Sequence, residues 1–215
     1  MGDIHIVTII IIAANAIISF KGFSDRYFFD KYKFNVSAIK NGEQIRMFTS
    51  GFLHVDGTHL FVNMLTLYFF AGVVIQSVGV VPFLTIYLGS LVLGNLLSLY
   101  FHKDEPLYTA VGASGAVMGV LYSAILLYPD MMLGLFFIIP IPAYIFGIGY
   151  LLYSIYGMQS RRDNIGHDAH FGGAMGGYFI TMIVSPWVFQ EHLLMVFLLA
   201  IPIVVLFILK KMGKI

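Results

Sequence analysis

A serine and a histidine, each close to glycines, are the residues of this sequence with the clearest potential for chemistry. Ser114 lies in Gly-Ala-Ser-Gly at residues 112–115, and His170 lies in Ala-His-Phe-Gly-Gly at residues 169–173. A serine hydroxyl becomes a good nucleophile only when a base takes its proton, and a histidine within hydrogen-bonding reach can be that base. The two residues therefore predict acyl-transfer chemistry, with Ser114 as the nucleophile and His170 as the general base.

Such chemistry also needs hydrogen-bond donors for the oxyanion that forms when the serine attacks a carbonyl. His59 and Asn63 are four residues apart, so on a helix they share one face. The backbone N–H of Ser114 is a further donor if it lies in a first helical turn, because such groups have no intrahelical partner. We expect His59, Asn63 and the Ser114 backbone to form an oxyanion site.

Each of these residues also has a purely structural interpretation. Small residues around a serine are common where membrane helices pack, and a lone intramembrane histidine often completes a hydrogen-bond network or relays protons. His59 with Asn63 could hold two helices together.

His167 and His170 have the spacing of half a metal site but lack carboxylate support, so we predict no metal and no cofactor. Asp168 is two residues from His170 and points elsewhere on a helix, which favours a Ser–His dyad over a triad.

The elements that position these residues are predicted to be membrane-spanning helices. The chain has 215 residues, of which 59% are hydrophobic and 11% charged, and its mean hydropathy is +0.89. A soluble domain has about 25% charged residues, so this composition indicates a membrane protein. The net charge of +1 gives no indication of a nucleic-acid partner. The absence of cysteine excludes disulfides, thiolate metal sites and a cysteine nucleophile.

Seven segments approach the length of about 20 mostly apolar residues that a span needs. We predict an all-α, polytopic helical membrane protein with a single domain over residues 1–215. Its core of six helices occupies about 1–187, and a seventh helix follows at 193–209. The predicted spans are Ile4–Phe20, Thr58–Gly79, Pro82–Phe101, Val111–Tyr128, Gly134–Tyr156, Ala169–Trp187 and Leu193–Leu209.

Prolines and one polar stretch interrupt this apolar pattern. The fifth segment contains Pro140 and Pro142 and the seventh contains Pro202, which spanning helices tolerate where neighbours satisfy the freed carbonyl. Lys21–Asp56 is the long polar stretch between the first two spans. Thr58, directly after it, is expected to be the N-cap of the second helix.

The alternation of the spans places the N-terminal ends of the second, fourth and sixth helices on one side of the membrane. His59, Asn63, Ser114 and His170 lie near these three ends, so they are predicted to converge at one depth. Small residues four apart let helix backbones approach closely. The fourth and sixth helices each carry such a pair, Gly115 with Gly119 and Gly173 with Gly177.

Together these motifs resemble rhomboid intramembrane serine proteases over roughly residues 40–187. The resemblance implies Ser114 as nucleophile, His170 as base, and His59 and Asn63 at the oxyanion site. It also implies a multi-pass protein of a bacterial cell membrane that cleaves transmembrane substrates, contacts membrane lipids and uses no cofactor. The matching residues are His54, His59-Leu60, Asn63, Gly-Ala-Ser-Gly at 112–115, Ala169 to Gly173, and Arg46 followed by Phe48 and Thr49.

The chain departs from the family pattern at two positions. Ile45 stands where the family often has tryptophan, and Met118 stands where an aromatic residue often stacks on the base. These departures leave open a second hypothesis, a non-catalytic, chaperone-like relative that binds unstable spanning helices. A third hypothesis, a small transporter or proton channel, would use the intramembrane histidines but lacks the carboxylates that such relays tend to use.

The charge distribution leaves the orientation open. With seven spans, all twelve Lys and Arg residues fall on the side opposite the N-terminus, which is also the side of the proposed site. The positive-inside rule assigns that side to the cytoplasm, whereas bacterial members of the family usually open away from it. The sequence also leaves open the oligomeric state and the identity of the substrate.

Overall fold

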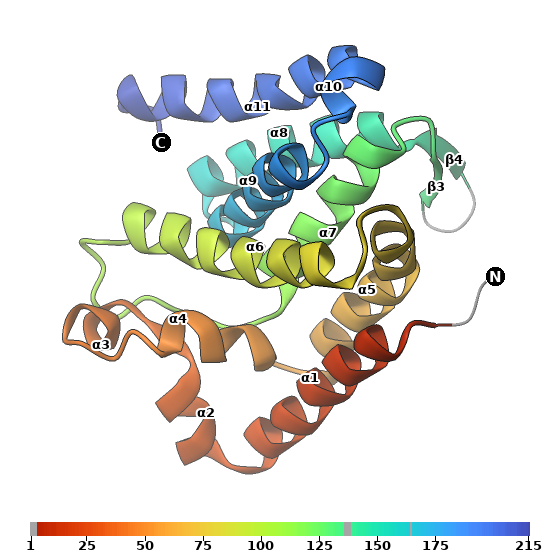
Figure 1. The fold of residues 1–215 in the computed structure, drawn as a ribbon. Coiled ribbons are helices and arrows are strands. Elements are labelled where there is room, and N and C mark those ends of the chain that lie inside the picture. The colour runs from red at the N-terminus through yellow and green to blue at the C-terminus, as the bar shows by residue number, and fades with distance from the viewer. Residues whose placement is uncertain (1–3, 136–138, 164) are drawn as a thin grey trace.

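The structure is a computed structural model that describes residues 4–135, 139–163 and 165–215. In these ranges the chain is a helical bundle with two short, two-stranded sheets (Figure 1). The order of the long helices confirms the predicted all-α, polytopic class. The helices of 14 or more residues are α1 (Ile6–Ser24), α5 (Gly57–Val78), α6 (Val80–Phe101), α7 (Ser114–Leu127), α8 (Ala143–Ser160), α9 (His167–Val184) and α11 (Leu193–Lys211).

The central helix α7 explains how a serine comes to lie below the surface. Helices α1, α5, α6 and α11 are long and apolar enough to cross a membrane by length and composition. Helix α7 is apolar but has only 14 residues, about 21 Å at 1.5 Å per residue, whereas the hydrocarbon layer is about 30 Å thick. Its residues Gly115 to Leu127 are all buried by neighbouring helices. Helix α7 therefore starts inside the bundle, and Ser114 is its first residue.

The fifth predicted span is wrong at residues 134, 135 and 139–142, and its residues 136–138 lie outside the described ranges. Strand β3 (Met132–Leu135) pairs antiparallel with β4 (Ile139–Pro142), and α8 begins only at Ala143. Both prolines of the segment lie in β4, an edge strand where the missing N–H of proline is tolerated. Hydropathy alone misses this boundary because a short apolar run fits a strand as well as a helix.

The N-cap of α5 is Asp56 rather than Thr58. The Asp56 carboxylate accepts the backbone N–H of His59 at 2.7 Å. The helix therefore begins one residue earlier than the predicted span, at Gly57. A negative charge at this end also interacts favourably with the helix dipole.

Helices α6, α7 and α9 pack through the predicted glycines. A Cβ on Gly173 would overlap the carbonyl of Gly115, and a Cβ on Gly177 would overlap the carbonyl of Gly119. On α6, a Cβ on Gly94 would lie 2.6 Å from a backbone oxygen of α9. These helices therefore touch backbone to backbone, which side chains would prevent, and the N-terminal ends of α7 and α9 come together.

The polar stretch between α1 and α5 covers one end of the bundle (Figure 1). Buried Arg46 holds it together: its guanidinium donates to the carbonyls of Asp30 and Lys33 at 2.8 and 3.0 Å. Strand β1 pairs with β2 (Thr109–Ala110), which fastens this stretch to the segment that leads into Ser114. Its short elements are α2 (Arg26–Tyr32), β1 (Phe34–Asn35), α3 (Val36–Lys40), α4 (Arg46–Thr49) and the 3-10 helix η1 (Ser50–Phe52).

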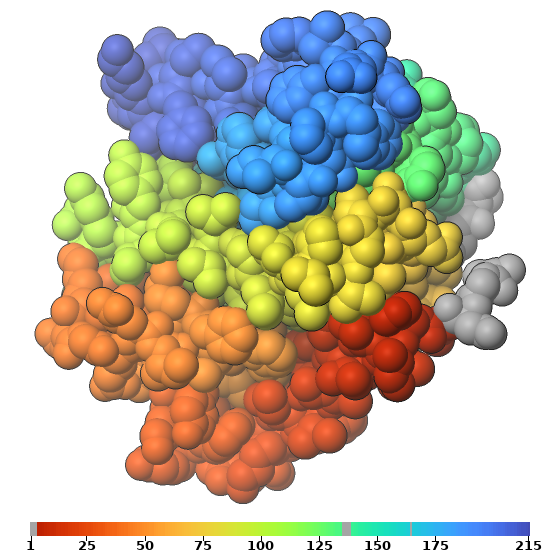
Figure 2. Space-filling model, in the orientation of Figure 1, coloured from red at the N-terminus to blue at the C-terminus, as the bar shows by residue number. Residues whose placement is uncertain are grey.

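The seventh helix, α11, follows the short α10 (Val188–Glu191) and packs along α8 at one edge of the molecule (Figures 1 and 2). The Tyr178 hydroxyl of α9 donates to the carbonyl of Val196 at 2.8 Å. At its far end the Lys210 ammonium lies 4.3 Å from the ring centroid of Phe101. The C-terminus thus lies at the end that α3 and α4 cover, and α1 begins at the other end (Figure 1).

Candidate active site

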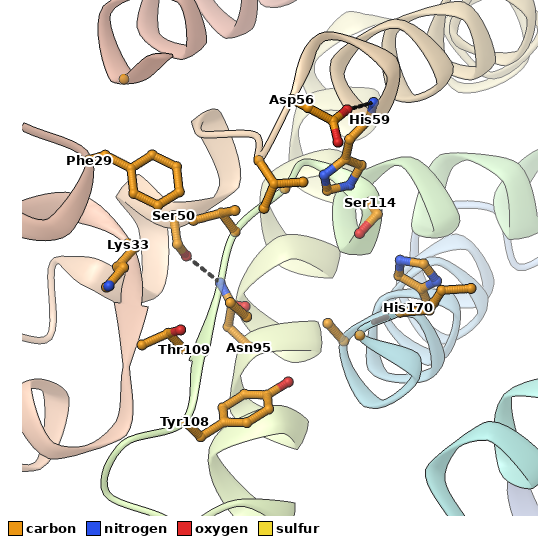
Figure 3. A pocket seen from close by; sticks show the side chains of 18 of the residues that line it. Phe29, Lys33, Ser50, Asp56, His59, Asn95, Tyr108, Thr109, Ser114 and His170 are labelled. Atoms are coloured by element: carbon orange, nitrogen blue, oxygen red, sulfur yellow. Dashed lines mark hydrogen bonds between the residues drawn. The ribbon is translucent and has the colours of Figure 1, made fainter. Parts of the chain in front are cut away.

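Ser114 and His170 line one cavity of about 1000 Å³ at the end of the bundle where α7 and α9 begin. Figure 3 shows the Ser114 hydroxyl pointing into the hollow between the rings of His59 and His170. The three residues come from α7, α5 and α9, so the helix ends that the alternation of spans predicted to converge do lie together. The wall also includes polar side chains that suit it to hold water, among them Ser50, Asp56, Asn95, Thr109 and Tyr150.

Ser114 is the first residue of α7, after Ala113 as N-cap. Its backbone N–H is therefore one of the first-turn donors that a helix cannot pair internally. The N-terminal end of a helix carries a partial positive charge of about half a unit. A negative charge that develops beside Ser114 is stabilised by both effects.

Gly112 shapes the wall between His59 and Ser114. Its φ of 132° is in the range that favours glycine, and its N–H donates to the carbonyl of Ser50 at 3.0 Å. A Cβ on Gly112 would lie 2.6 Å from Cε1 of His59 and 3.6 Å from the Ser114 hydroxyl oxygen. A larger residue at this position would therefore push the His59 ring away from the serine.

The two predicted oxyanion side chains differ in their placement. The His59 ring lines the cavity, and its Nδ1 is buried without a hydrogen-bond partner within the described part of the chain. Asn63 is buried, its amide donates to the backbone carbonyl of His59 at 3.1 Å, and it is not among the described residues that line the cavity. The structure thus brings His59, but not the Asn63 amide, to the serine.

His54 ties the segment before the serine to the first helix. Its Nε2 accepts the backbone N–H of Ala113 at 3.3 Å, and its Nδ1 lies 2.9 Å from the Ser19 hydroxyl oxygen. Since Nε2 accepts, Nδ1 carries the proton and donates to Ser19, whose own hydroxyl donates to the carbonyl of Phe52 at 3.0 Å. Burial first, and then the nearby His59, lowers the pKa of His54 to about 3, so the ring stays neutral.

The His170 ring meets an aromatic side chain of α8. The Tyr150 hydroxyl oxygen lies 2.5 Å from His170 Nδ1, and the two rings stack with centroids 6.1 Å apart and planes 27° apart. Met118, four residues after Ser114, is buried on α7. The aromatic ring against the histidine therefore comes from another helix.

The acidic residue nearest in sequence to His170 points away from it, as predicted. Asp168 lies 3.5 Å from Nε2 of His102, at the end of α6. His167 lies 3.1 Å from Asp163. In the ranges that the structure describes, no group of three His, Asp or Glu side chains is arranged to hold a metal ion.

His102 connects the loop ahead of Ser114 to α9. Its Nδ1 bonds to Glu105 at 2.9 Å, its Nε2 faces Asp168, and its ring stacks on Tyr108 with centroids 3.5 Å apart. Burial alone would lower the pKa of His102, but the interactions with the carboxylates of Asp168 and Glu105 outweigh burial and raise it. His102, when protonated, thus links the loop to the helix that carries His170.

Sequence reasoning did not single out Tyr150 or the contact between Gly112 and His59. Tyr150 belongs to an apolar helix that also contains Tyr144, Tyr153 and Tyr156, and no local pattern separates it from them. Gly112 was part of the recognised motif, but its positive φ and its neighbour are properties of the folded chain.

The fold and the cavity define a helical, multi-pass membrane protein that brings a serine and a histidine together at the buried N-terminal ends of two helices. The family model for the rhomboid domain matches residues 41–187. This match covers well over half of the chain, and the protein therefore belongs to the rhomboid family.

Curated relatives include proteins of a plant, a yeast and a bacterium. RHOMBOID-like protein 12, mitochondrial, of Arabidopsis thaliana is 28% identical over 81% of this chain and 56% of its own length. Rhomboid protein 1, mitochondrial, of Saccharomyces cerevisiae is 31% identical over 69% of this chain and 44% of its own. The putative rhomboid protease YdcA of Bacillus subtilis is 31% identical over 67% of this chain and 69% of its own. The chain thus spans about half the length of the two mitochondrial relatives.

Proposed function

We propose that this protein is an intramembrane serine endopeptidase that cleaves transmembrane helices, with Ser114 as nucleophile and His170 as general base. The observation that carries the proposal is the shared cavity, in which a serine hydroxyl and an imidazole face one polar hollow from two glycine-packed helices. Membership of the rhomboid family supports it, and one relative is named as a putative rhomboid protease.

The proposed reaction is acyl transfer to Ser114. The Ser114 oxygen attacks the peptide carbonyl carbon while its proton passes to His170. The oxyanion accepts hydrogen bonds from the Ser114 backbone N–H and the His59 ring, and the dipole of α7 stabilises it further. The imidazolium then protonates the leaving amine, and water activated by His170 hydrolyses the acyl-enzyme. Asn63 would join the oxyanion site only by turning away from the His59 carbonyl, to which it donates.

The depth of the serine suggests what a substrate must do. A peptide bond can reach Ser114 only if the substrate helix opens locally, because a regular helix shields its carbonyl carbons. We therefore propose transmembrane protein substrates with small or helix-weakening residues near the cleaved bond. Membrane lipids surround both enzyme and substrate.

The relatives do not support the bacterial cell membrane that the sequence analysis expected. Two of the three relatives described above are mitochondrial by name and one is from a bacterium, so they give no support to a bacterial cell membrane in particular. The supported description is a multi-pass membrane protein.

The test uses the purified protein in liposomes with a model transmembrane substrate and a serine-directed fluorophosphonate probe. We expect Ser114→Ala and His170→Ala to reduce cleavage to the background of empty liposomes and to abolish labelling. Matched controls are Ser24→Ala, at an exposed position, and His192→Ala, at the other end of the bundle, which should keep wild-type cleavage.

Cleavage that persists in Ser114→Ala would overturn the proposal. If the wild type takes up no label and cuts nothing, yet retains the substrate helix on gradient centrifugation, the non-catalytic, chaperone-like alternative replaces it. Flux of protons or solutes across the same liposomes would instead favour the transporter hypothesis.

A further inference from the structure

The His170 ring has two nitrogens, and the proposed reaction needs them in different protonation states. The nitrogen that faces Ser114 must carry a free lone pair to accept the serine proton, so the other nitrogen must carry the hydrogen. In a Ser-His-Asp triad the aspartate enforces this tautomer by accepting the second N–H. Here Asp168 faces His102, so a carboxylate does not do this from the adjacent turn of α9.

Tyr150 occupies the place of that third group. Its hydroxyl oxygen lies 2.5 Å from His170 Nδ1, which leaves Nε2 as the nitrogen available to Ser114. Tyr150 lines the same cavity as Ser114 and His170. A phenol oxygen can accept a hydrogen bond as well as donate one, so it can hold an Nδ1–H as the aspartate of a triad does.

The packing of α8 fixes the phenol in this position. The Tyr150 ring stacks on His170 and on Phe146, with 5.8 Å between the centroids of the last pair and an interplanar angle of 18°. The packing against Phe146 on the same helix thus limits how far the Tyr150 ring can turn away from His170.

We propose that Tyr150 is the positioning residue of the active site: its oxygen accepts the Nδ1–H of His170 and so presents the bare Nε2 to Ser114. This inference rests on the proposed protease function. During attack, one proton moves from the Ser114 oxygen to Nε2 as the oxygen bonds to the carbonyl carbon, and Tyr150 keeps its own proton. The Nδ1–H···O hydrogen bond strengthens as the ring becomes cationic, because charge-assisted hydrogen bonds are stronger than neutral ones.

The decisive variant is Tyr150→Phe, which keeps the stacked ring and removes only the acceptor. We expect kcat to fall by roughly 10- to 100-fold with KM little changed, the range for loss of one hydrogen bond to a charged group. The acidic limb of the profile of kcat/KM against pH should move to lower pH, because the His170 imidazolium loses the hydrogen bond to the Tyr150 oxygen.

Tyr153→Phe is the matched control. It lies one turn away, is exposed and bonds Asp163 at 3.1 Å, and it should retain activity within about twofold of wild type with an unchanged profile.

A second measurement does not depend on activity. Nitrogen-15 NMR of labelled histidine in liposomes should find His170 with the hydrogen on Nδ1 in the wild type and shifted toward Nε2 in Tyr150→Phe. An Nε2–H tautomer in the wild type, or a Tyr150→Phe variant with wild-type kcat, pH profile and tautomer, would overturn the role of Tyr150 while Ser114-dependent cleavage persisted. If the proposed protease function itself is wrong, the wild-type protein will show no Ser114-dependent cleavage or labelling. In that case the positioning role of Tyr150 is also wrong.

Discussion

At the scale of single residues, the site depends on groups whose neighbours leave them little freedom. Ser114 gains its favourable electrostatics from being the first residue of a helix. The His59 ring lies against Gly112, and the His170 ring lies against Tyr150. Each of these contacts constrains a ring that the proposed reaction uses, so small substitutions beside them should have large effects.

Gly112→Ala tests the contact with His59. The new methyl group would collide with the His59 ring, and the backbone would be held at a positive φ that alanine disfavours, at a cost of about 1–3 kcal/mol. We expect a lower thermal unfolding temperature and a loss of fluorophosphonate labelling at Ser114.

Gly42→Ala is the matched control for this prediction. Gly42 also has a positive φ, of 104°, but a Cβ there would meet nothing within 4 Å. It shares the backbone strain without the collision, so it should lose some stability and keep its labelling. Equal labelling in the two variants would contradict the steric argument.

At the scale of elements, three glycine-packed helices and one loop decide whether the serine and the histidine meet. Helices α7 and α9 touch through their backbones, and their N-terminal ends open into the cavity. The attachments that hold the loop from α6 to Ser114 include the β1–β2 pairing and the His102 bridge to α9. The first attachment uses backbone hydrogen bonds, whereas the second depends on a charge.

The stability of the protein should therefore depend on the protonation of His102. The folded-state pKa of His102 is raised above its ordinary value of 6.5, so the stabilisation is fully present below pH 6.5. It is lost as the pH rises through the folded-state pKa. We expect the difference in thermal unfolding temperature between wild type and His102→Gln to be largest near about pH 6 and to shrink toward about pH 9.

The comparison between the two proteins removes the effect of other titrating groups, such as His54, because both proteins share them. His192→Gln, at the opposite end of the bundle, controls for the loss of a histidine as such. A difference between wild type and His102→Gln that stays constant, or grows, with rising pH would show that the charge of His102 does not fasten the loop.

At the scale of the whole molecule, the chain passes between the two ends of the bundle along seven long helices, which is an odd number. The start of α1 and the C-terminus consequently lie at opposite ends (Figure 1). The cavity opens at the end that carries the C-terminus and the polar stretch between α1 and α5. With seven spans, all twelve Lys and Arg residues fall on the side of the membrane at which the cavity opens. The positive-inside rule describes a charge bias of this kind.

Topology reporters can test this arrangement. Reporters fused to the two termini should give opposite signals, and a reporter inserted at exposed Gly42 should agree with the C-terminal one. Truncation before Leu193 removes α11 and should move the C-terminal signal to the other side. Identical signals from the two termini of the full chain would contradict seven crossings, and the side found for the C-terminus gives the orientation of the site.

The sequence by itself determined the features that depend on composition and local spacing. The excess of apolar residues defines a membrane protein, and the helix starts other than that of α8 lie within three residues of their predictions. The pairs of glycines four apart marked the contact between α7 and α9, because that contact needs small residues whatever else surrounds it. Ser114 and His170 could be proposed as the candidate site because their motifs are local.

Only the tertiary structure decided the features that depend on neighbours distant in the chain. Residues 132–135 and 139–142 are strands because they pair with each other, which hydropathy does not register. Asn63 turns to the carbonyl of His59, and Tyr150 rather than another tyrosine of α8 meets His170. The physical reason is that hydrophobic periodicity reports which side of a helix is apolar, whereas the partner of a polar group depends on how helices pack in three dimensions.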